Sequence, residues 1–189
     1  MANFTALYDA CVLYPAPLRD FLLRLAMTDL FRARWSDDIH DEWTRNVLAK
    51  RTDLKEEYLL RTRELMNKAV PDCLVTGYEA IIDGLTLPDP DDRHVLAAAI
   101  RSHTGVIVTF NLKDFPEAVL EEYGIEAQHP DEFIAHLLDL NPGAVCNAAK
   151  LQRQSLRNPP KTVEEFLDTL LKQGLAGTVS KLEGMIDLI

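Results

Sequence analysis

The segment Val106–Thr109 constrains the fold of this chain more than any other part of its sequence. It consists of Val-Ile-Val-Thr, an almost unbroken run of β-branched residues, which is typical of a strand buried in a parallel sheet. The preceding segment, Asp91–Ser102, is rich in small residues and predicts a helix that packs closely against such a sheet. Gly105 separates the two elements. A helix followed directly by a buried strand indicates an α/β domain.

Strands and helices alternate along the first 140 residues. Besides the central run, short apolar stretches predict strands at Phe4–Asp9, Phe31–Trp35 and Ile125–Gln128. Apolar spacing, prolines and polar caps predict further helices at residues 15–27, 36–50, 54–69, 116–123 and 130–139. This alternation predicts an α/β fold with a mainly parallel central sheet and helices on both of its faces.

Residues 141–189 follow a different pattern. Helices are predicted at residues 144–156, 163–173 and 175–188, and Thr162 and Glu165 have the spacing of a capping box. No strand is expected in this part of the chain. We therefore expect two units, an α/β domain over residues 1–140 and an all-helical C-terminal extension over residues 141–189.

The negative charge of the chain is concentrated in its middle. The formal net charge is −10, and residues 66–140 contain fourteen acidic residues against four basic ones. Because an acidic surface repels phosphates, nucleic acid is not expected to bind through a general positive field. The acidic block is either a solvated face or a wall that recruits divalent cations, and the positions of the acids decide between these interpretations.

Four carboxylates fall where an open parallel sheet collects its ligands, near the carboxyl ends of its strands. Asp9 ends the first predicted strand, Asp114 follows the Val-Ile-Val-Thr strand, Asp92 opens the helix before it, and Glu42 lies on the second predicted helix. Divalent cations such as Mg²⁺ prefer oxygen ligands of this kind. Each acid alone has an ordinary interpretation as a turn former, a helix cap or a solvated surface group. If they do cluster, repulsion should raise the pKa of at least one.

Four short segments, taken together, resemble a known family. YDACVLYP resembles the opening Asp-x-Asn-x-Leu strand of PIN-domain nucleases, with Asp9 as the first metal ligand. HDEWTRNVL resembles the Glu-x-x-Arg-x-Leu helix of that family, which carries Glu42. DDRHVLAAA is similar to its Asp-x-x-(apolar)₂-Ala-x-Ala helix, and this similarity places the third ligand at Asp92.

The fourth segment, VTFNLKDFP, is similar to the closing segment of the family and contains Thr109, Asn111 and Asp114. Each motif is weak by itself, but all four occur in the family's order across residues 4–135. Two positions depart from the pattern. Cys11 stands where many members have Asn, and Asn111 stands where some members have an acid, which leaves Asp114 as the fourth carboxylate.

The resemblance implies a Mg²⁺- or Mn²⁺-dependent endoribonuclease. In this interpretation Asp9, Glu42, Asp92 and Asp114 bind the metal, and Thr109 and Asn111 complete the catalytic set. These roles are implied by the resemblance to the family. The helical tail resembles the extension found in one branch of VapC-like toxin components of bacterial toxin–antitoxin pairs. The implied partners are an RNA substrate and an antitoxin protein, and a homodimer is left open.

Two further expectations concern the surroundings of the protein. No apolar stretch is long enough to cross a membrane and no secretory signal precedes Asp9, so a cytoplasmic protein without membrane contact is expected. RNA is expected to be held by metal and by arginines of the N-terminal third. The candidates are Arg19, Arg24, Arg32, Arg34, Arg45 and Arg51. An antitoxin is expected to place an apolar helix in a groove near Asp9 and to offer a cation to the carboxylates.

A second functional interpretation stays open, a catalytically weak PIN-like protein-interaction module that uses the tail helices as its interface. Intact carboxylates at all four positions favour the nuclease. A phosphatase is disfavoured because Cys11 stands where its second Asp would be, and a Rossmann-type cofactor domain is disfavoured because no GxGxxG follows the first strand. The three cysteines are predicted to be small buried hydrophobes, and the five histidines to be surface or satisfied core residues.

Overall fold

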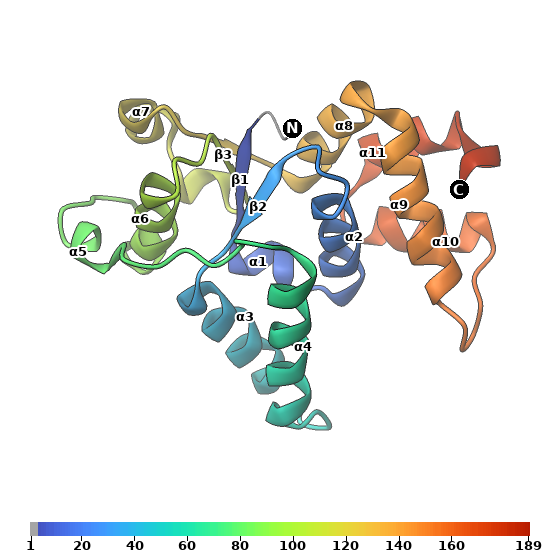
Figure 1. Ribbon diagram of the computed structural model, residues 1–189, viewed down its shortest axis with the longest axis horizontal. Helices are drawn as coiled ribbons and strands as arrows, with labels where there is room; N and C mark the ends of the chain where they lie inside the picture. Colours follow the sequence, from blue (N-terminus) through green and yellow to red (C-terminus); the bar gives the residue numbers. More distant parts are fainter. Residues whose placement is uncertain (1–3) are drawn as a thin grey trace.

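A four-stranded sheet in which every pairing is parallel forms the centre of the molecule (Figure 1). Strands β1 (Thr5–Tyr8), β2 (Arg32–Arg34), β3 (Val106–Val108) and β4 (Glu126–Gln128) lie in the order β2-β1-β3-β4. This computed structural model describes residues 4–189, so the first three residues of the predicted nuclease domain lie outside the described residues. The predicted mainly parallel sheet is confirmed.

The two central strands are also the most apolar ones. All three residues of β3 are buried, and Ala6, Leu7 and Tyr8 of β1 are fully buried, as expected for strands covered on both faces. The edge strands β2 and β4 carry charged residues instead, among them Arg32 and Glu126. Charged side chains on edge strands discourage pairing with other chains.

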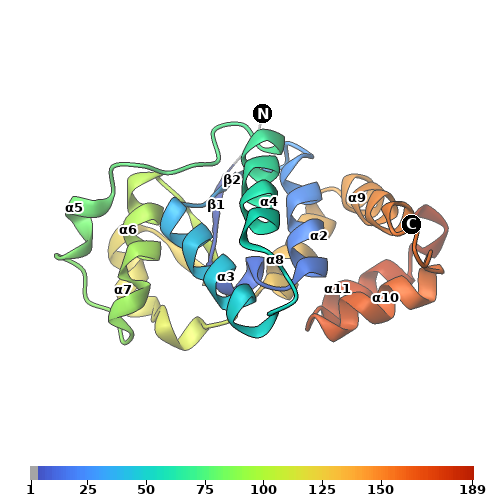
Figure 2. The ribbon, with the colours of Figure 1, turned by 90° about the horizontal axis from the view of Figure 1, so that it is seen from below.

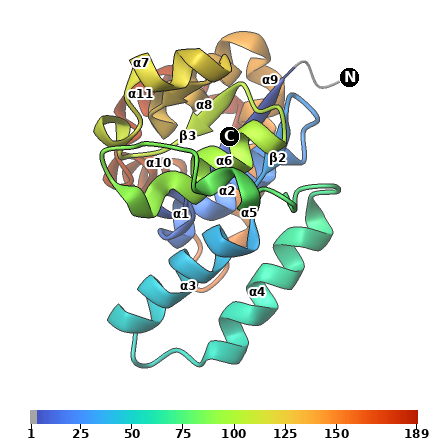
Figure 3. The ribbon, with the colours of Figure 1, turned by 90° about the vertical axis from the view of Figure 1, so that its left-hand side faces the viewer.

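Helices cover both faces of the sheet, as predicted. The helices of the α/β part are α1 (Ala10–Leu13), α2 (Ala16–Ala26), α3 (Asp37–Lys50), α4 (Glu56–Ala69), α5 (Glu79–Ile82), α6 (Arg93–Arg101), α7 (Glu117–Leu120) and α8 (Pro130–Leu140). Seen from below, α6 and α2 lie on opposite sides of β1 (Figure 2). Helices α3 and α4 form a hairpin that extends away from the sheet (Figure 3).

Several short helices were not predicted or begin elsewhere than expected. Helices α1 and α5 have four residues each, too few to show an apolar period in the sequence. The helix predicted to begin at Asp91 starts with the 3₁₀ turn η1 (Pro90–Asp92), and α6 follows it. Three further 3₁₀ turns are η2 (Leu112–Asp114), η3 (Glu121–Tyr123) and η4 (Ile186–Leu188).

The C-terminal part is helical, as predicted, and packs directly on the α/β part. It contains α9 (Pro142–Ser155), α10 (Val163–Lys172) and α11 (Ala176–Glu183), besides an isolated bridge between Arg157 and Pro160. The capping box of Thr162 and Glu165 is present. Helix α9 lies beside α2, where the buried Gln152 donates from Nε2 to the carbonyl oxygen of Pro17 over 2.8 Å. The division at residue 141 stays a prediction.

The tail is also tied to α8. The carboxylate of Asp131 accepts hydrogen bonds from the backbone N–H groups of Gly177 and Thr178, at 2.8 and 2.7 Å. These groups belong to the first turn of α11, where a negative charge stabilises the free N–H groups and the positive end of the helix dipole. Within residues 4–189, no helix is long and apolar enough to cross a membrane.

Candidate metal centre at the carboxyl ends of the strands

Asp9 lies where β1 ends and joins the ends of the two central strands. Its backbone N–H donates to the carbonyl oxygen of Val108 in β3. Its carboxylate caps α1, because Oδ1 accepts from the N–H of Ala10 at 2.6 Å. The other oxygen, Oδ2, accepts from the Thr109 hydroxyl at 2.7 Å and from the Cys11 thiol at 3.0 Å. Asp9 is only 2% exposed, and these three hydrogen bonds hold its carboxylate in one orientation.

Cys11 corrects the prediction that all three cysteines are buried hydrophobes. Cys73 and Cys146 are buried, but Cys11 is half-buried and takes part in the polar site. Its sulfur donates to Asp9 and accepts from the backbone N–H of Phe110 at 3.3 Å. Burial, followed by the charge of Asp9, raises the pKa of the Cys11 thiol, so the sulfur stays protonated and able to donate.

The pKa of Asp9 shows opposing influences. Burial, the largest of them, raises it above its usual value. The hydrogen bonds from Thr109 and Cys11 lower it, and the charge of Glu42 raises it again. The net result is an elevated pKa. The carboxylate at the end of β1 therefore lacks a compensating positive charge.

Next to Asp9, a polar pocket of about 640 Å³ opens between α3 and the start of α6. Three of the predicted site residues line it: Glu42, Asp92 and Asn111. The remaining lining residues are mostly acidic or polar, and they are Asp38, Asp41, Arg45, Asn46, Asp89, Asp91 and His94. The central acidic block of the sequence thus contributes one wall of this pocket, although other acids of the block lie elsewhere.

The charges of all three other predicted carboxylates affect the pKa of Asp92. Its pKa is raised to about 7, first by burial and then by the charges of Asp9, Asp89, Asp114 and Glu42. The direction of the shift is the one expected for a member of a carboxylate cluster, and burial contributes more to it than any single neighbouring charge does. Asp114, in η2 and half-buried, acts on Asp92 through its charge but is not among the residues that line the pocket.

The donor chemistry of these residues fits a hard divalent cation. All four carboxylates offer oxygen ligands, and no salt bridge within the described part of the chain neutralises Asp9, Asp92 or Asp114. However, no three His, Cys, Asp or Glu side chains among residues 4–189 stand close enough together to hold an ion as they are placed. Binding would require the carboxylates to move closer together.

His94 is a site residue that the sequence did not predict. It lies in the first turn of α6 and lines the pocket, with Nε2 3.4 Å from Oε2 of Glu42. Burial lowers the pKa of His94, but its hydrogen bond with Glu42 and the charge of Glu42 outweigh burial, so the net pKa is raised. The one available signal was its place two residues after Asp92. His40, by contrast, is a satisfied core residue as predicted, hydrogen-bonded to Asn67 and Trp43.

Three of the six arginines expected to hold RNA have other partners. Arg19 lies over the ring of Trp43 at 4.6 Å and donates to the carbonyl oxygen of Leu13. Arg24 pairs with Asp20, and Arg51 pairs with Asp53. Arg45 is the member of the set that lines the carboxylate pocket.

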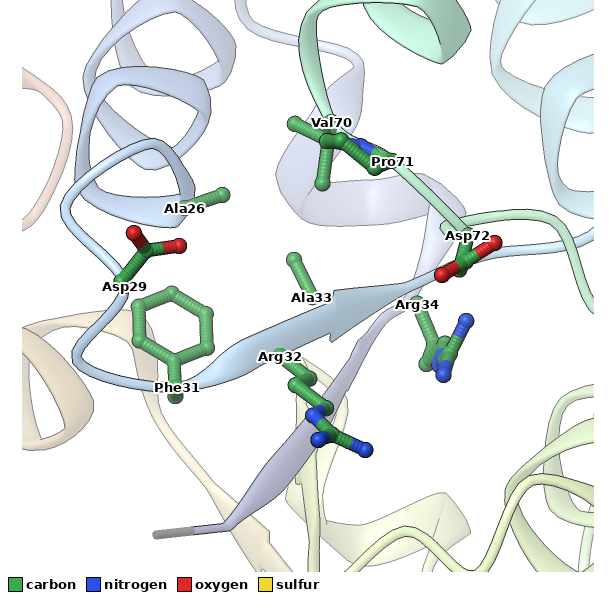
Figure 4. Close-up of a pocket in the computed structure, with 9 residues that line it drawn as sticks. All are labelled: Ala26, Asp29, Phe31, Arg32, Ala33, Arg34, Val70, Pro71 and Asp72. Carbon is green, nitrogen blue, oxygen red and sulfur yellow. The ribbon is translucent and has the colours of Figure 1, made fainter. Parts of the chain in front are cut away.

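Arg32 and Arg34 line a different pocket, of about 270 Å³, along β2 (Figure 4). Both side chains leave the strand on the side opposite Ala33, as the alternation of a strand requires. Asp29 and Asp72 lie at the margins of the same pocket. Its lining shares no residue with the carboxylate pocket. These two arginines therefore belong to another part of the surface.

The fold and the site together define an α/β protein with acidic residues at the carboxyl ends of parallel strands. The family described as "PIN domain" matches residues 5–113. The chain therefore belongs to the PIN-domain family, as its four sequence motifs predicted. A second family, described as "VapC50 C-terminal domain", matches residues 130–184, which comprise α8 and most of the helical tail.

A curated relative supports the same assignment. The chain is 45% identical over 82 residues to a protein of Mycobacterium tuberculosis (strain ATCC 25618 / H37Rv) named "Putative ribonuclease VapC50". The aligned part covers 43% of this chain and 48% of that protein, so the chain spans about half the length of the relative it matches. No solved structure matches the chain.

Proposed function

We propose that this protein is a metal-dependent endoribonuclease and the toxin of a type II toxin–antitoxin pair. Membership of the PIN-domain family and the similarity to a protein named as a ribonuclease support this proposal. The observation that carries it is the acidic pocket lined by Glu42, Asp92 and Asn111, in which burial, followed by the charges of Asp9, Asp89, Asp114 and Glu42, raises the pKa of Asp92 to about 7. A site that gathers uncompensated negative charge in this way is suited to a cation.

In the proposed site, Asp9, Glu42, Asp92 and Asp114 hold Mg²⁺ or Mn²⁺. The bound ion would activate a water molecule and offset negative charge on the phosphoryl oxygens of RNA. Thr109 keeps Asp9 in place through its hydroxyl, which at the same time accepts from the backbone N–H of Asn111 at 3.0 Å. Thr109 thus couples the end of β1 to the loop after β3.

Arg45 is the residue best placed to meet the RNA backbone beside the carboxylates. It is exposed and lines the pocket together with Glu42, and it forms no salt bridge with any of the described residues. A guanidinium group can contact a phosphate through two parallel hydrogen bonds. One such local contact, together with metal, would allow a chain of net charge −10 to hold RNA.

A groove between α3 and α4 is the proposed binding place of an antitoxin helix. Leu48, Leu59 and Leu60 contribute its apolar part, and Leu60 is 46% exposed. Asp41 and Arg45 line both this groove and the carboxylate pocket, so the two are adjacent. An apolar helix in the groove could therefore extend a basic side chain to the carboxylates. Inhibition of cleavage by a protein encoded beside this chain would support the pairing.

An RNA cleavage assay tests the proposed activity. The full chain should cut single-stranded RNA in Mg²⁺ or Mn²⁺, lose activity in EDTA and regain it when metal is added back. Asp9→Asn keeps the shape of the side chain but removes its charge, and it should abolish cleavage while the circular dichroism spectrum stays unchanged. By resemblance to the family, the products should carry a 5′-phosphate and a 3′-hydroxyl. Full activity in EDTA or in the Asp9→Asn variant would contradict the proposal.

The second candidate function is a catalytically weak PIN-like interaction module. The observation in its favour is that no three acidic, histidine or cysteine side chains within residues 4–189 are gathered for metal binding. Calorimetric titration with MnCl₂ separates the two candidates, because a nuclease of this type must bind the ion. Binding that is lost in Asp9→Asn supports the nuclease, and the absence of any binding supports the module.

A further inference from the structure

His94 and Glu42 form the polar contact that links α3 to α6 across the carboxylate pocket. The imidazole Nε2 lies 3.4 Å from Oε2 of Glu42, and the side chains are 17% and 30% exposed. Both residues line the pocket, with Asp92 at the start of the same turn of helix as His94. The contact is therefore part of the pocket wall.

The two carboxylates Asp9 and Glu42 differ in how firmly they are held. Asp9 accepts three hydrogen bonds, from Ala10, Cys11 and Thr109. For Glu42, the contact with His94 is the one side-chain hydrogen bond or salt bridge found within the described residues. A glutamate has three rotatable side-chain bonds, and without an anchor it loses considerable rotamer freedom when it is fixed by a ligand. The orientation of Glu42 thus depends on His94.

The chemistry of the contact fixes which group donates. The carboxylate of Glu42 only accepts, so in this 3.4 Å contact the proton between the two groups belongs to Nε2 of His94. The other ring nitrogen, Nδ1, is buried and has no hydrogen-bond partner among the described residues. Nε2 is therefore the ring nitrogen through which His94 meets another side chain.

We propose that His94 is a positioning residue for Glu42: its Nε2–H group, 3.4 Å from Oε2, holds the carboxylate in place at the wall of the pocket and thereby raises the affinity of the site for a divalent cation. The inference rests on the proposed function, since it concerns the same metal site. Hydrogen-bond donors to metal-binding carboxylates fix their orientation, and losing such a donor costs about 10- to 100-fold in metal affinity. His94 acts through Glu42 in this account and does not itself bind the ion.

Two substitutions of similar polarity and different reach test this role. In His94→Gln the side-chain amide nitrogen can occupy the place of Nε2, whereas in His94→Asn it reaches only to the place of Nδ1. The control is His136→Asn, which removes an imidazole from a separate pocket lined by Phe4 and Gln128. Circular dichroism of each full-length variant monitors the fold. Calorimetric titration with MnCl₂ and with MgCl₂ gives the affinity for each ion.

We expect His94→Asn to weaken binding of both ions by roughly 10- to 100-fold, and His94→Gln and His136→Asn to stay within about threefold of the natural chain. Unchanged affinity in His94→Asn would overturn the inference. A loss confined to Mn²⁺ would also overturn it, because it would make the imidazole a direct ligand with the preference of nitrogen for transition metals. If the natural chain binds neither ion, the proposed function fails as well; if it binds both and His94→Asn does too, only this inference fails.

Discussion

Replacing Asp92 by Asn should stabilise the metal-free protein, although it damages the proposed site. The pKa of Asp92 rises from 3.8 to about 7 in the folded protein, because burial and four neighbouring carboxylates oppose its ionisation. The side chain makes no capping hydrogen bond at the start of α6, so the amide removes the charge without removing a structural contact. The substitution therefore isolates the cost of the charge.

The size and sign of the effect follow from the two pKa values. A rise from 3.8 to about 7 corresponds to about 4 kcal/mol of unfavourable free energy for the ionised form. Because Asp92 is only half-buried, solvent screening should reduce this to about 2 kcal/mol. The cost is absent below pH 4, where the unfolded chain also binds the proton. It grows as the pH rises from 4 to 7, and it is complete above the pKa of the folded protein.

Urea unfolding in EDTA, followed by the fluorescence of the buried Trp35 and Trp43, measures this effect. Asp92→Asn should raise the free energy of unfolding by about 2 kcal/mol at pH 8 and by much less at pH 5. The control Asp187→Asn removes an exposed acid of the tail and should change little at either pH. Millimolar Mg²⁺ should reverse the order, since only the natural chain keeps all its ligands. A variant that is no more stable at pH 8, or equally more stable at both pH values, would refute the reasoning.

Three further predictions concern the contacts around the site and the tail. Thr109→Val keeps the shape of a fully buried side chain but removes its hydrogen bonds with Asp9 and Asn111, so it should cost about 1–3 kcal/mol in urea unfolding and raise the pKa of Asp9 further. The Cys11 thiol, with its raised pKa, should react with iodoacetamide at pH 8 far more slowly than in the unfolded chain, as measured by mass spectrometry; equal rates would contradict the burial and hydrogen bonding described. Asp131→Ala removes two charge-assisted hydrogen bonds to α11 and should lower the free energy of unfolding by about 1.5–3 kcal/mol, whereas Asp131→Asn, which keeps one acceptor oxygen, should lower it by less.

The fold could be predicted from the sequence because its main signals are local. The central strand and its helices can be predicted without knowledge of distant contacts. The signals are the Val-Ile-Val-Thr run, the small residues before it, and the prolines and glycines that separate the elements. Helix α1 could not be predicted in this way, because four residues show no period and its start depends on the cap that Asp9 provides. The presence of α1 follows from the position of Asp9 at the carboxyl end of β1.

The candidate site could be predicted only in part from the sequence. The roles of several of its residues depend on contacts between segments that are far apart in the chain. Residue type predicts Cys11 as a small hydrophobe, but the fold brings the sulfur to Asp9 and Thr109. The relation of His94 to Glu42 appears only once the fold brings these two side chains of α6 and α3 into contact. Arg19 carries a charge that suggests RNA binding, and the fold places it over Trp43 instead.

The most direct test of the central claim, a divalent cation held by the dispersed carboxylates, is anomalous diffraction from crystals of the protein soaked in MnCl₂. The account predicts a manganese peak between Asp9, Asp92 and Asp114, with Glu42 turned toward it. Crystals of Asp9→Asn treated in the same way should lack the peak or show it much weakened. A well-ordered site with no peak at these carboxylates, or a peak that persists in Asp9→Asn, would contradict the account.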